Sequence, residues 1–158
     1  MTSVVALRPL TASDLDEVFE QMRDPTAVWM AAFTPEDPGD RAAFDRRMRR
    51  ILDDPQTNAS AITADGVLVG SISTFPSDEG LPEVTYWIAR SHWGQGIAGR
   101  ALQLMLDQTD RPLLARAASD NAASLRSLER IGFRQIGTNR DFAPGRGAEV
   151  EETLLRLE

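Results

Sequence analysis

A glycine-rich turn between a strand pattern and a helix pattern is the feature that most constrains this chain. The turn and the start of the helix read WGQGIAGRAL at residues 93–102, and the strand pattern before them reads EVTYWIA at residues 83–89. Glycines without Cβ atoms let a ligand approach the main chain closely. The first turn of a helix presents unsatisfied N–H donors and the positive end of its dipole. The pattern therefore predicts a site for a phosphate-bearing cofactor.

The composition removes several other kinds of chemistry. The 158 residues include no cysteine and one histidine, His92, and all 17 basic residues are arginine. Disulfides, thiolate–metal sites, a cysteine nucleophile, a Schiff-base lysine and the lysine of the phosphate loop GxxxxGK[ST] are therefore excluded. A site of several histidines is excluded too, and we expect no metal.

Charge and hydropathy restrict the classes of partner that this protein can bind. The formal net charge of −7 argues against nucleic acid, because neutralising phosphates needs a basic face, and it agrees with a cationic substrate. No run approaches the ~20 apolar residues of a membrane span, and the start shows no signal-cleavage pattern. We expect one cytoplasmic domain over residues 1–158, without membrane contact, and the sequence leaves a homodimer open.

Periodicity along the chain predicts an α+β fold. Helix patterns occupy residues 15–22, 26–33, 40–52, 96–108 and 121–131. Strand patterns occupy residues 4–10, 59–63, 67–75, 83–89, 112–117, 133–138 and 150–157. The pair Asp65-Gly66 predicts a hairpin, whereas the glycine turn leads into a β-α-β crossover. We therefore predict antiparallel strands first, then one parallel crossover, with helices flanking the sheet.

Local signals also predict helix ends and one helix face. Asp24-Pro25 is expected to end the first helix, and Gly132 is expected to stop the helix over 121–131. Four arginines of the helix over 40–52 are expected to form a solvated face: Arg46, Arg47, Arg49 and Arg50.

Two cofactors are compatible with the glycine turn. Gly94, Gly96 and Gly99 match the dinucleotide fingerprint GxGxxG, and Asp120 lies about 20 residues later, where a ribose-binding acid would sit. However, the strands before the turn are joined by hairpins, and too few residues follow it for a six-stranded parallel sheet. The segment DNAAS at 120–124 also indicates a helix start. The pattern therefore favours another phosphate-bearing cofactor over a nicotinamide dinucleotide.

Two motifs in the right order resemble the GNAT (GCN5-related N-acetyltransferase) superfamily. They are WGQGIA at 93–98 and NAASLRSLERIGF at 121–133. The chain is most similar to the branch that acetylates ribosomal-protein N-termini and related amines, which LRPLTASDL at 7–15 and YWI at 86–88 also resemble. The resemblance covers nearly the whole chain. It implies a GNAT-like mixed, mostly antiparallel sheet and an acetyl-CoA-dependent N-acetyltransferase acting on a protein N-terminus or a small amine.

Two positions depart from the superfamily pattern. The signature [Q/R]xxGx[G/A] is matched at Gly96 and Ala98, but Trp93 occupies the Gln/Arg position, as is common in this branch. Leu128 stands where many relatives carry a tyrosine that protonates the departing thiolate. The resemblance therefore leaves two alternatives open: a catalytically weak CoA-binding sensor, and an acetyltransferase of small polycationic drugs or polyamines.

The resemblance assigns main-chain groups to the cofactor. Trp87, Ile88 and Ala89 would pair with the pantetheine arm, and one of their amides would face the oxyanion. N–H groups of the turn would bind the pyrophosphate: Gly94, Gln95, Gly96, Ile97, Ala98 and Gly99. Asn121 is expected to cap the second helix and to contact the pantetheine.

Two residues are candidates for proton transfer. Glu83 lies where some relatives place a catalytic glutamate, and as a general base it can act through one water. The alternative is an exposed strand glutamate. Ser124 is the candidate proton donor to the thiolate, or a partner of the cofactor. The alternative is a serine that satisfies a backbone N–H in the first turn of its helix.

Two aromatic residues are candidates for binding the acceptor. Trp29 lies in a region that forms one side of the acceptor pocket in relatives, and a core anchor is the alternative. Tyr86 is the second candidate, although Tyr86 and Trp87 are also expected to pack the two faces of the sheet. His92 is expected to be a surface-loop histidine, with contact to the pyrophosphate as its alternative.

Overall fold

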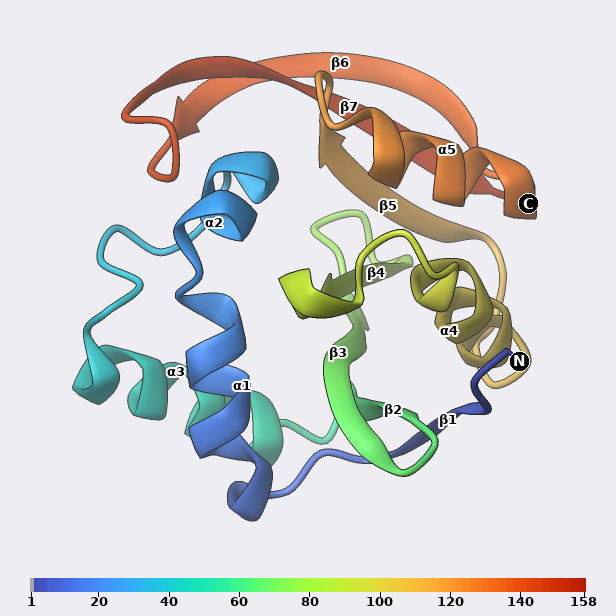
Figure 1. Ribbon diagram of the computed structural model, residues 1–158. Helices are drawn as coiled ribbons and strands as arrows, with labels where there is room; N and C mark the ends of the chain where they lie inside the picture. Colours follow the sequence, from blue (N-terminus) through green and yellow to red (C-terminus); the bar gives the residue numbers. More distant parts are fainter. Residues whose placement is uncertain (1) are drawn as a thin grey trace.

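The computed structural model describes residues 2–158, which build a seven-stranded sheet with helices on both faces (Figure 1). The strands lie in the order β1-β2-β3-β4-β5-β7-β6. Their bounds are β1 Val5–Pro9, β2 Asn58–Ala64, β3 Val67–Pro76, β4 Pro82–Ile88, β5 Leu113–Ala118, β6 Arg134–Ala143 and β7 Ala148–Leu157. The α-helices are α1 Leu15–Met22, α2 Pro25–Ala31, α3 Arg41–Asp53, α4 Ile97–Leu106 and α5 Ala122–Ile131. Short 3-10 helices lie at η1 Ala12–Asp14 and η2 Arg90–His92.

The pairing confirms the predicted α+β topology. Strands β4 and β5 are parallel and are connected through α4, and every other neighbouring pair is antiparallel. The sheet therefore has one β-α-β crossover, at the glycine turn. A dinucleotide-binding fold needs a parallel sheet, so the nicotinamide interpretation of the turn is wrong.

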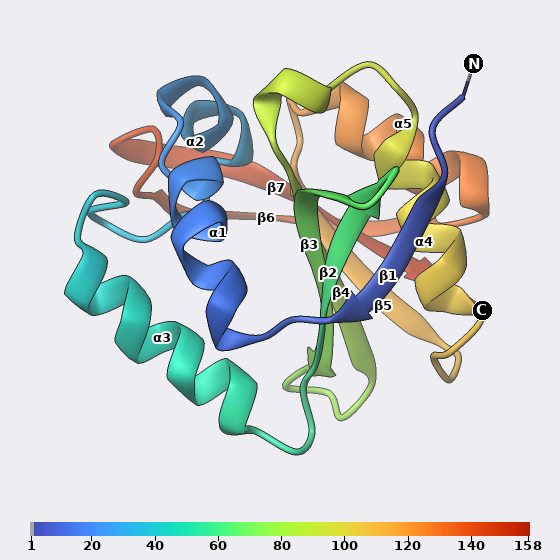
Figure 2. The same ribbon diagram turned by 60° about the horizontal axis from the view of Figure 1, so that its bottom comes forward.

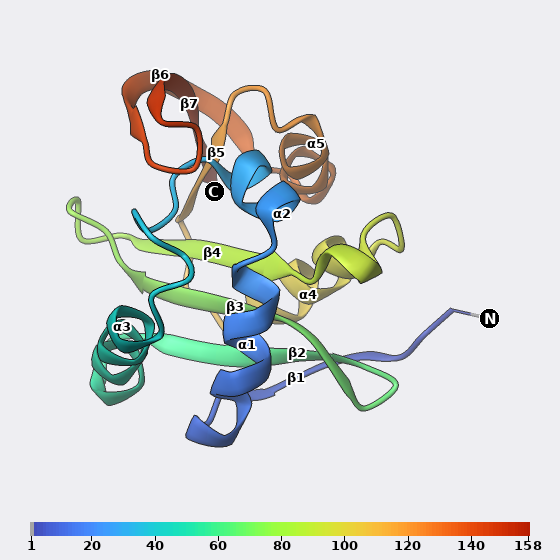
Figure 3. The same cartoon turned by 60° about the vertical axis from the view of Figure 1, so that its left-hand side comes forward.

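Each face of the sheet carries its own core. Helices α1 and α3 cover one face around Phe19 and Phe44, whose rings meet edge to face at 5.2 Å between centroids. Helices α4 and α5 cover the opposite face, where Ile72, Met105 and Leu155 are fully buried (Figure 3). Each such side chain stabilises the fold by about 1.5–3 kcal/mol through its burial. The cores fix the sheet between two helical layers.

Local turn signals account for several element ends. Asp65 and Gly66 have φ of 50° and 80°, as a two-residue type I′ hairpin requires, and Gly132 ends α5 at φ 119°. Asp24-Pro25 not only follows α1 but also begins the next helix. The Asp24 carboxylate accepts from the Ala27 N–H at 2.9 Å and Pro25 is the first helical residue, so the pair starts α2.

The predicted arginine face of α3 is solvated except at one position. Arg46, Arg49 and Arg50 are exposed, whereas Arg47 is half-buried with its guanidinium 5.5 Å from the centre of the Phe44 ring. Contact with an aromatic face holds this one side chain against the core.

The hairpin of β6 and β7 is longer than the strand pattern predicts. Strand β6 continues to Ala143, although every residue before Ala143 is exposed. A strand exposed on both faces has no apolar alternation, so its length cannot be read from periodicity. The loop over residues 144–147 reaches α2, where the Gly145 N–H donates to the Ala32 carbonyl at 2.8 Å (Figure 2).

Candidate cofactor and active site

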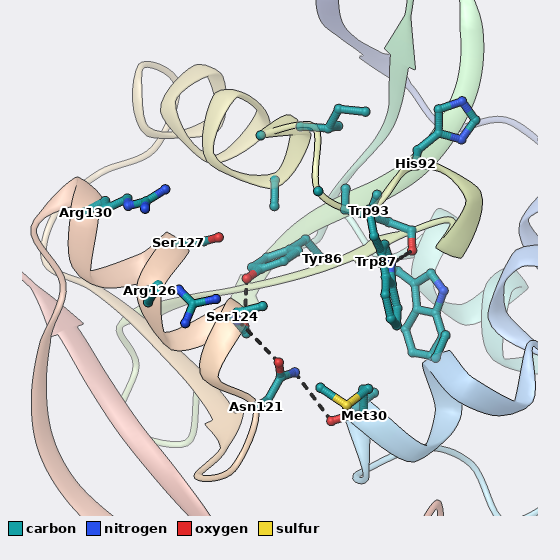
Figure 4. A pocket seen from close by; sticks show the side chains of 18 residues that line it. Met30, Tyr86, Trp87, His92, Trp93, Asn121, Ser124, Arg126, Ser127 and Arg130 are labelled. Carbon is teal, nitrogen blue, oxygen red and sulfur yellow. Dashed lines mark hydrogen bonds between the residues drawn. The ribbon is translucent and has the colours of Figure 1, made fainter.

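A cleft of about 450 Å³ opens where β4 and β5 separate (Figure 4). Its walls come from the end of β4, the glycine turn with the start of α4, and helices α5 and α2. The charged or titratable side chains that line it, besides a tyrosine, are His92, Arg126 and Arg130. No carboxylate lines it among the described residues, although the protein has 24 acidic residues. The cleft is therefore locally cationic on an acidic protein.

The two central strands stop pairing with each other before they reach the cleft. They pair at only two positions, Glu83 with Leu114 and Val84 with Ala115. The Ala89 N–H donates to the Val69 carbonyl at 2.8 Å, and antiparallel residues alternate between bonded and non-bonded pairs.

This alternation decides which residues of β4 face the gap. Trp87 and Ala89 direct their main-chain groups to β3, whereas Tyr86 and Ile88 direct theirs away from β3. Of the three residues predicted to pair with the pantetheine, only Ile88 therefore faces the gap with its backbone, and Tyr86 joins it.

The glycine turn leaves the first turn of α4 open to the cleft. Gly94 and Gly96 have φ of 76° and 72°, which favours glycine, and a Cβ added at either would meet open space. Gly96 is the N-cap, and no side chain caps the helix. The N–H groups of Ile97 and Ala98, both at the cleft wall, have no acceptor within the helix.

Arg100 holds the turn from behind. Its guanidinium donates to the Gln95 carbonyl at 3.0 Å and its Nε donates to the Gly96 carbonyl at 3.4 Å. It also donates to the Ser3 carbonyl beside β1. With these carbonyls held by Arg100, the turn is fixed in the conformation that opens the α4 donors to the cleft.

Three hydrogen bonds join β4, α5 and α2 across the cleft (Figure 4). The Tyr86 hydroxyl lies 2.7 Å from the Ser124 Oγ. Asn121 caps α5 as predicted, accepting from the Ser124 N–H at 3.3 Å, and its Nδ2 donates to the Met30 carbonyl at 3.4 Å. Burial raises the pKa of Tyr86 above its usual value, partly opposed by the Ser124 hydrogen bond, so the phenol is protonated near neutral pH.

Two tryptophans frame the other side of the cleft. Trp93, at the position usually held by Gln or Arg, donates from its indole to the Ile88 carbonyl at 2.9 Å. Trp87 donates from its indole to the Gln21 carbonyl at 3.2 Å, on the face of the sheet opposite Tyr86. His92 also lines the cleft, and its Nδ1 lies 3.0 Å from the Ser91 hydroxyl.

Several predicted site residues lie outside the cleft lining: Glu83, Ala89, Gln95, Gly99 and Trp29. Glu83 is not the exposed strand glutamate of the alternative interpretation, because it is 9% exposed and its Oε1 lies 3.3 Å from Arg116 Nε. Trp29 is not a core anchor, because it is 55% exposed beneath the guanidinium of Arg146.

The cleft also contains residues that the sequence reasoning missed. They are Ala27, Met30, Ala31, Ala123, Arg126, Ser127 and Arg130. Those on α5 carried a signal, since Asn121, Ser124 and Ser127 recur every three residues and Arg126 and Arg130 are four apart, as on one helical face. Those on α2 carried none, because their position depends on contacts with distant loops.

Comparisons with known proteins agree with this geometry. Residues 5–134 match the family described as "Acetyltransferase (GNAT) domain". Over 99% of its length the chain is 24% identical to the uncharacterized N-acetyltransferase p20 of Bacillus licheniformis, of which it covers 93%.

Solved structures share the fold. Mycobacterium smegmatis RimJ, in complex with CoA-disulfide, matches with a TM-score of 0.77 and 22% identity over 99% of this chain and 84% of that one. Spermidine N-acetyltransferase of Vibrio cholerae, in complex with CoA and spermine, matches with a TM-score of 0.78 and 17% identity over 96% and 95%. The family match identifies the protein as an acyltransferase. The chain belongs to the GNAT acetyltransferase family.

Within residues 2–158, no group of three or more His, Cys, Asp or Glu side chains is placed to hold a metal ion. In the same part of the chain, no helix is long and apolar enough to cross a bilayer.

Proposed function

We propose that this protein transfers the acetyl group of acetyl-CoA directly to a primary amine. The observation that carries the proposal is the cleft, where the uncapped start of α4 faces Arg126 and Arg130 with no carboxylate among the described lining residues. Such a surface suits a polyanion, because helix N-termini and guanidinium groups both bind phosphate. We treat residues 1–158 as one cytoplasmic domain with this activity.

The cleft gives acetyl-CoA a direction. Its diphosphate is assigned to the N–H groups between Gly94 and Gly99, with Arg126 and Arg130 on the facing helix. Its pantetheine arm is assigned to the main-chain groups of Tyr86 and to the Ile88 N–H, as an added strand would bind, because the Ile88 carbonyl already accepts from the Trp93 indole. The acyl end then lies toward Asn121.

Proton transfer is assigned to both sides of the gap. We propose that Ser124 donates the proton that the thiolate takes up when the C–S bond breaks. The Tyr86 phenol, 2.7 Å from the Ser124 hydroxyl, is a second donor. We assign Glu83 the proton that the amine loses when the C–N bond forms, through one water. A main-chain N–H of β4 stabilises the oxyanion between these steps.

The acceptor is proposed to be cationic before it reacts. On the face of β4 and β5 that carries Glu83, the Arg116 guanidinium lies 3.3 Å from Glu83 and 3.6 Å from Glu152. Burial raises the pKa of Glu152, opposed by Arg116. The neighbouring Asp141 leaves this region net negative, as a protein N-terminus or a small amine would require. The name of the Vibrio cholerae neighbour fits the small-amine alternative.

A thermal-shift assay with CoA, acetyl-CoA and NAD tests the proposal first. A ligand at about one hundred times its Kd adds about 2.7 kcal/mol to the free energy of unfolding, and we expect this for CoA and acetyl-CoA only. A thiol-release assay with a panel of amines follows, without background because the protein has no cysteine. Stabilisation by NAD alone contradicts the proposal, and CoA binding without thiol release from any amine identifies the sensor.

A further inference from the structure

Helix α2 closes one end of the cleft. Figure 4 shows Met30 and Arg130 at opposite ends, with Tyr86 between them. Ala27 and Ala31, one helical turn apart, line the same end as Met30. The function proposed above places the diphosphate beside Arg130, so the acyl group comes to the α2 end. Two small side chains leave space there, and the flexible Met30 side chain limits it.

The end of α2 that carries Met30 is held by three donors from two distant segments. The last carbonyls of a helix have no donors within the helix, so outside donors determine where that end sits. These donors are Arg146 Nε to the Trp29 carbonyl, Asn121 Nδ2 to the Met30 carbonyl at 3.4 Å, and Gly145 N–H to the Ala32 carbonyl at 2.8 Å.

Arg146 uses its whole guanidinium for this attachment. Both terminal nitrogens donate to the Asp120 carboxylate at 2.8 Å, and the Arg146 Cζ lies 4.6 Å from the centre of the Trp29 ring. The Arg146 side chain is 8% exposed, whereas that of Asp120 is 63% exposed. One side chain therefore joins the β6–β7 loop, the connection before α5 and helix α2, in a geometry that lysine cannot reproduce.

The backbones of the β6–β7 loop and the end of α2 approach each other closely at this contact. A Cβ at Gly145 would lie 2.6 Å from the Val28 carbonyl oxygen and 2.8 Å from the Ala32 oxygen. Ala32 itself is fully buried with φ 65°, a conformation that a residue with a Cβ keeps only where its surroundings impose it. The β6–β7 loop and the end of α2 are therefore packed backbone against backbone.

We propose that α2 limits the length of the acyl group, with Met30 as the limiting side chain and Arg146 as the positioning residue that holds the helix. The inference rests on the proposed function, because that function gives the cleft its direction. Shortening Met30 enlarges the acyl end directly. Removing Arg146 releases the Trp29 carbonyl and lets the helix end move away from the cleft.

The test measures Kd for CoA, acetyl-CoA, butyryl-CoA and hexanoyl-CoA by calorimetry, which needs no acceptor. We expect the wild-type protein to bind butyryl-CoA at least tenfold more weakly than acetyl-CoA, since two extra methylenes must displace Met30. Met30→Ala brings the two values within about twofold, and Arg146→Met reduces their ratio several-fold. Affinity for CoA itself stays within about twofold in both variants.

Matched control variants distinguish a positioning role of Arg146 from a general loosening of the fold. Arg140→Met removes an exposed arginine from the same hairpin, whose side chain donates to the Glu149 carbonyl at 3.4 Å, and leaves the ratio unchanged. Asp120→Asn weakens the partner of Arg146 without a cavity and shifts the ratio in the same direction as Arg146→Met, by less. Unchanged ratios in Met30→Ala and Asp120→Asn, with normal CoA binding, overturn the inference. A wild-type protein that binds no CoA overturns the proposed function instead.

Discussion

Helices α4 and α5 begin on facing walls of one cleft, but their first turns are built differently. Asn121 caps α5, accepting from the Ser124 N–H at 3.3 Å, whereas α4 begins at Gly96 with no side-chain cap. Helices α2 and α3 are like α5 in this respect, because the carboxylates of Asp24 and Asp40 cap them. A side-chain cap contributes about 1 kcal/mol, which α4 forgoes. The difference indicates that α5 offers side chains to the site and α4 offers main-chain donors.

The largest expected effect comes from a carboxylate placed at the open start of α4. Gly96→Asp puts a negative charge where we assign the diphosphate and is expected to weaken CoA binding about a hundredfold, by repulsion and by occupying the α4 donors. Gly96→Asn lacks the charge, and its effect on the affinity for CoA is expected to be about tenfold smaller than that of Gly96→Asp. Calorimetric Kd values measure both.

Gly80 supplies the control for backbone strain. It has φ 80°, close to that of Gly96, and open space around its Cβ position, but it lies in the β3–β4 turn away from the cleft. Gly80→Asp should cost similar stability and leave the Kd for CoA unchanged. Equal loss of CoA binding in both aspartate variants would mean that strain, not charge at α4, explains the result.

The first turn of α5 is expected to act through the Ser124 hydroxyl. Ser124→Ala lowers kcat about 10²-fold while CoA binding changes little, because the thiolate loses its proton donor. Tyr86→Phe lowers kcat less, since it removes only the second donor of the pair. Steady-state kinetics with the most active amine measure kcat and KM for both, and normal kcat in Ser124→Ala would leave the serine with a structural role.

The two arginines of α5 that line the cleft are expected to attract CoA through their charge and not through a fixed hydrogen-bond geometry. Neither Arg126 nor Arg130 forms an ion pair within residues 2–158. Arg130→Met is expected to raise the Kd for CoA about fivefold at low salt and less at 0.5 M NaCl, because screening weakens the contribution that was removed. Arg134→Met, at the exposed start of β6, is the control and should change neither value. A loss that does not depend on salt would contradict the electrostatic role.

The smallest expected effect concerns α1. Its N-cap residue is Asp14, whose carboxylate accepts hydrogen bonds from the Arg8 side chain. Arg8 lies 2.8 Å from Asp14, and their hydrogen bond lowers the pKa of Asp14 to about 2. A lowered pKa stabilises the fold above the unfolded value near 4, and this stability is lost as pH falls toward 2. Because Arg8 is half-exposed, we expect Asp14→Asn to cost about 1 kcal/mol at pH 7 and nearly nothing near pH 2. Urea unfolding at both pH values measures this, and an equal cost at both would contradict it.

The parts of the fold that local chemistry determines could be predicted from the sequence. Asp65-Gly66 set a hairpin, Asn121 and Gly132 set the two ends of α5, and the glycine turn marked the crossover. The pattern predicts a β6 that is too short, because the strand is exposed on both faces and shows no alternation. Asp24-Pro25 predicts the end of one helix, although the same residues begin the next.

The parts of the site that tertiary contacts create could not be predicted. Nothing near Glu83 in the sequence reveals its ion pair with Arg116, 33 residues away. The hydrogen bond between Tyr86 and Ser124 spans 38 residues, and the contact of Arg146 with Trp29 spans 117. Main-chain binding at the turn needed only glycine spacing, whereas the wall formed by α2 depends on how the β6–β7 loop folds back.

A titration of the ¹⁵N-labelled protein with CoA, followed by backbone amide resonances, reports whether the start of α4 binds the diphosphate. We expect the amides of Gly96, Ile97 and Ala98 to shift most and to gain protection from hydrogen exchange, because their donors bind the diphosphate. The same amides should shift with adenosine 3′,5′-bisphosphate extended by a second 5′-phosphate, but not with pantetheine. CoA binding that leaves these three amides unmoved would contradict the account.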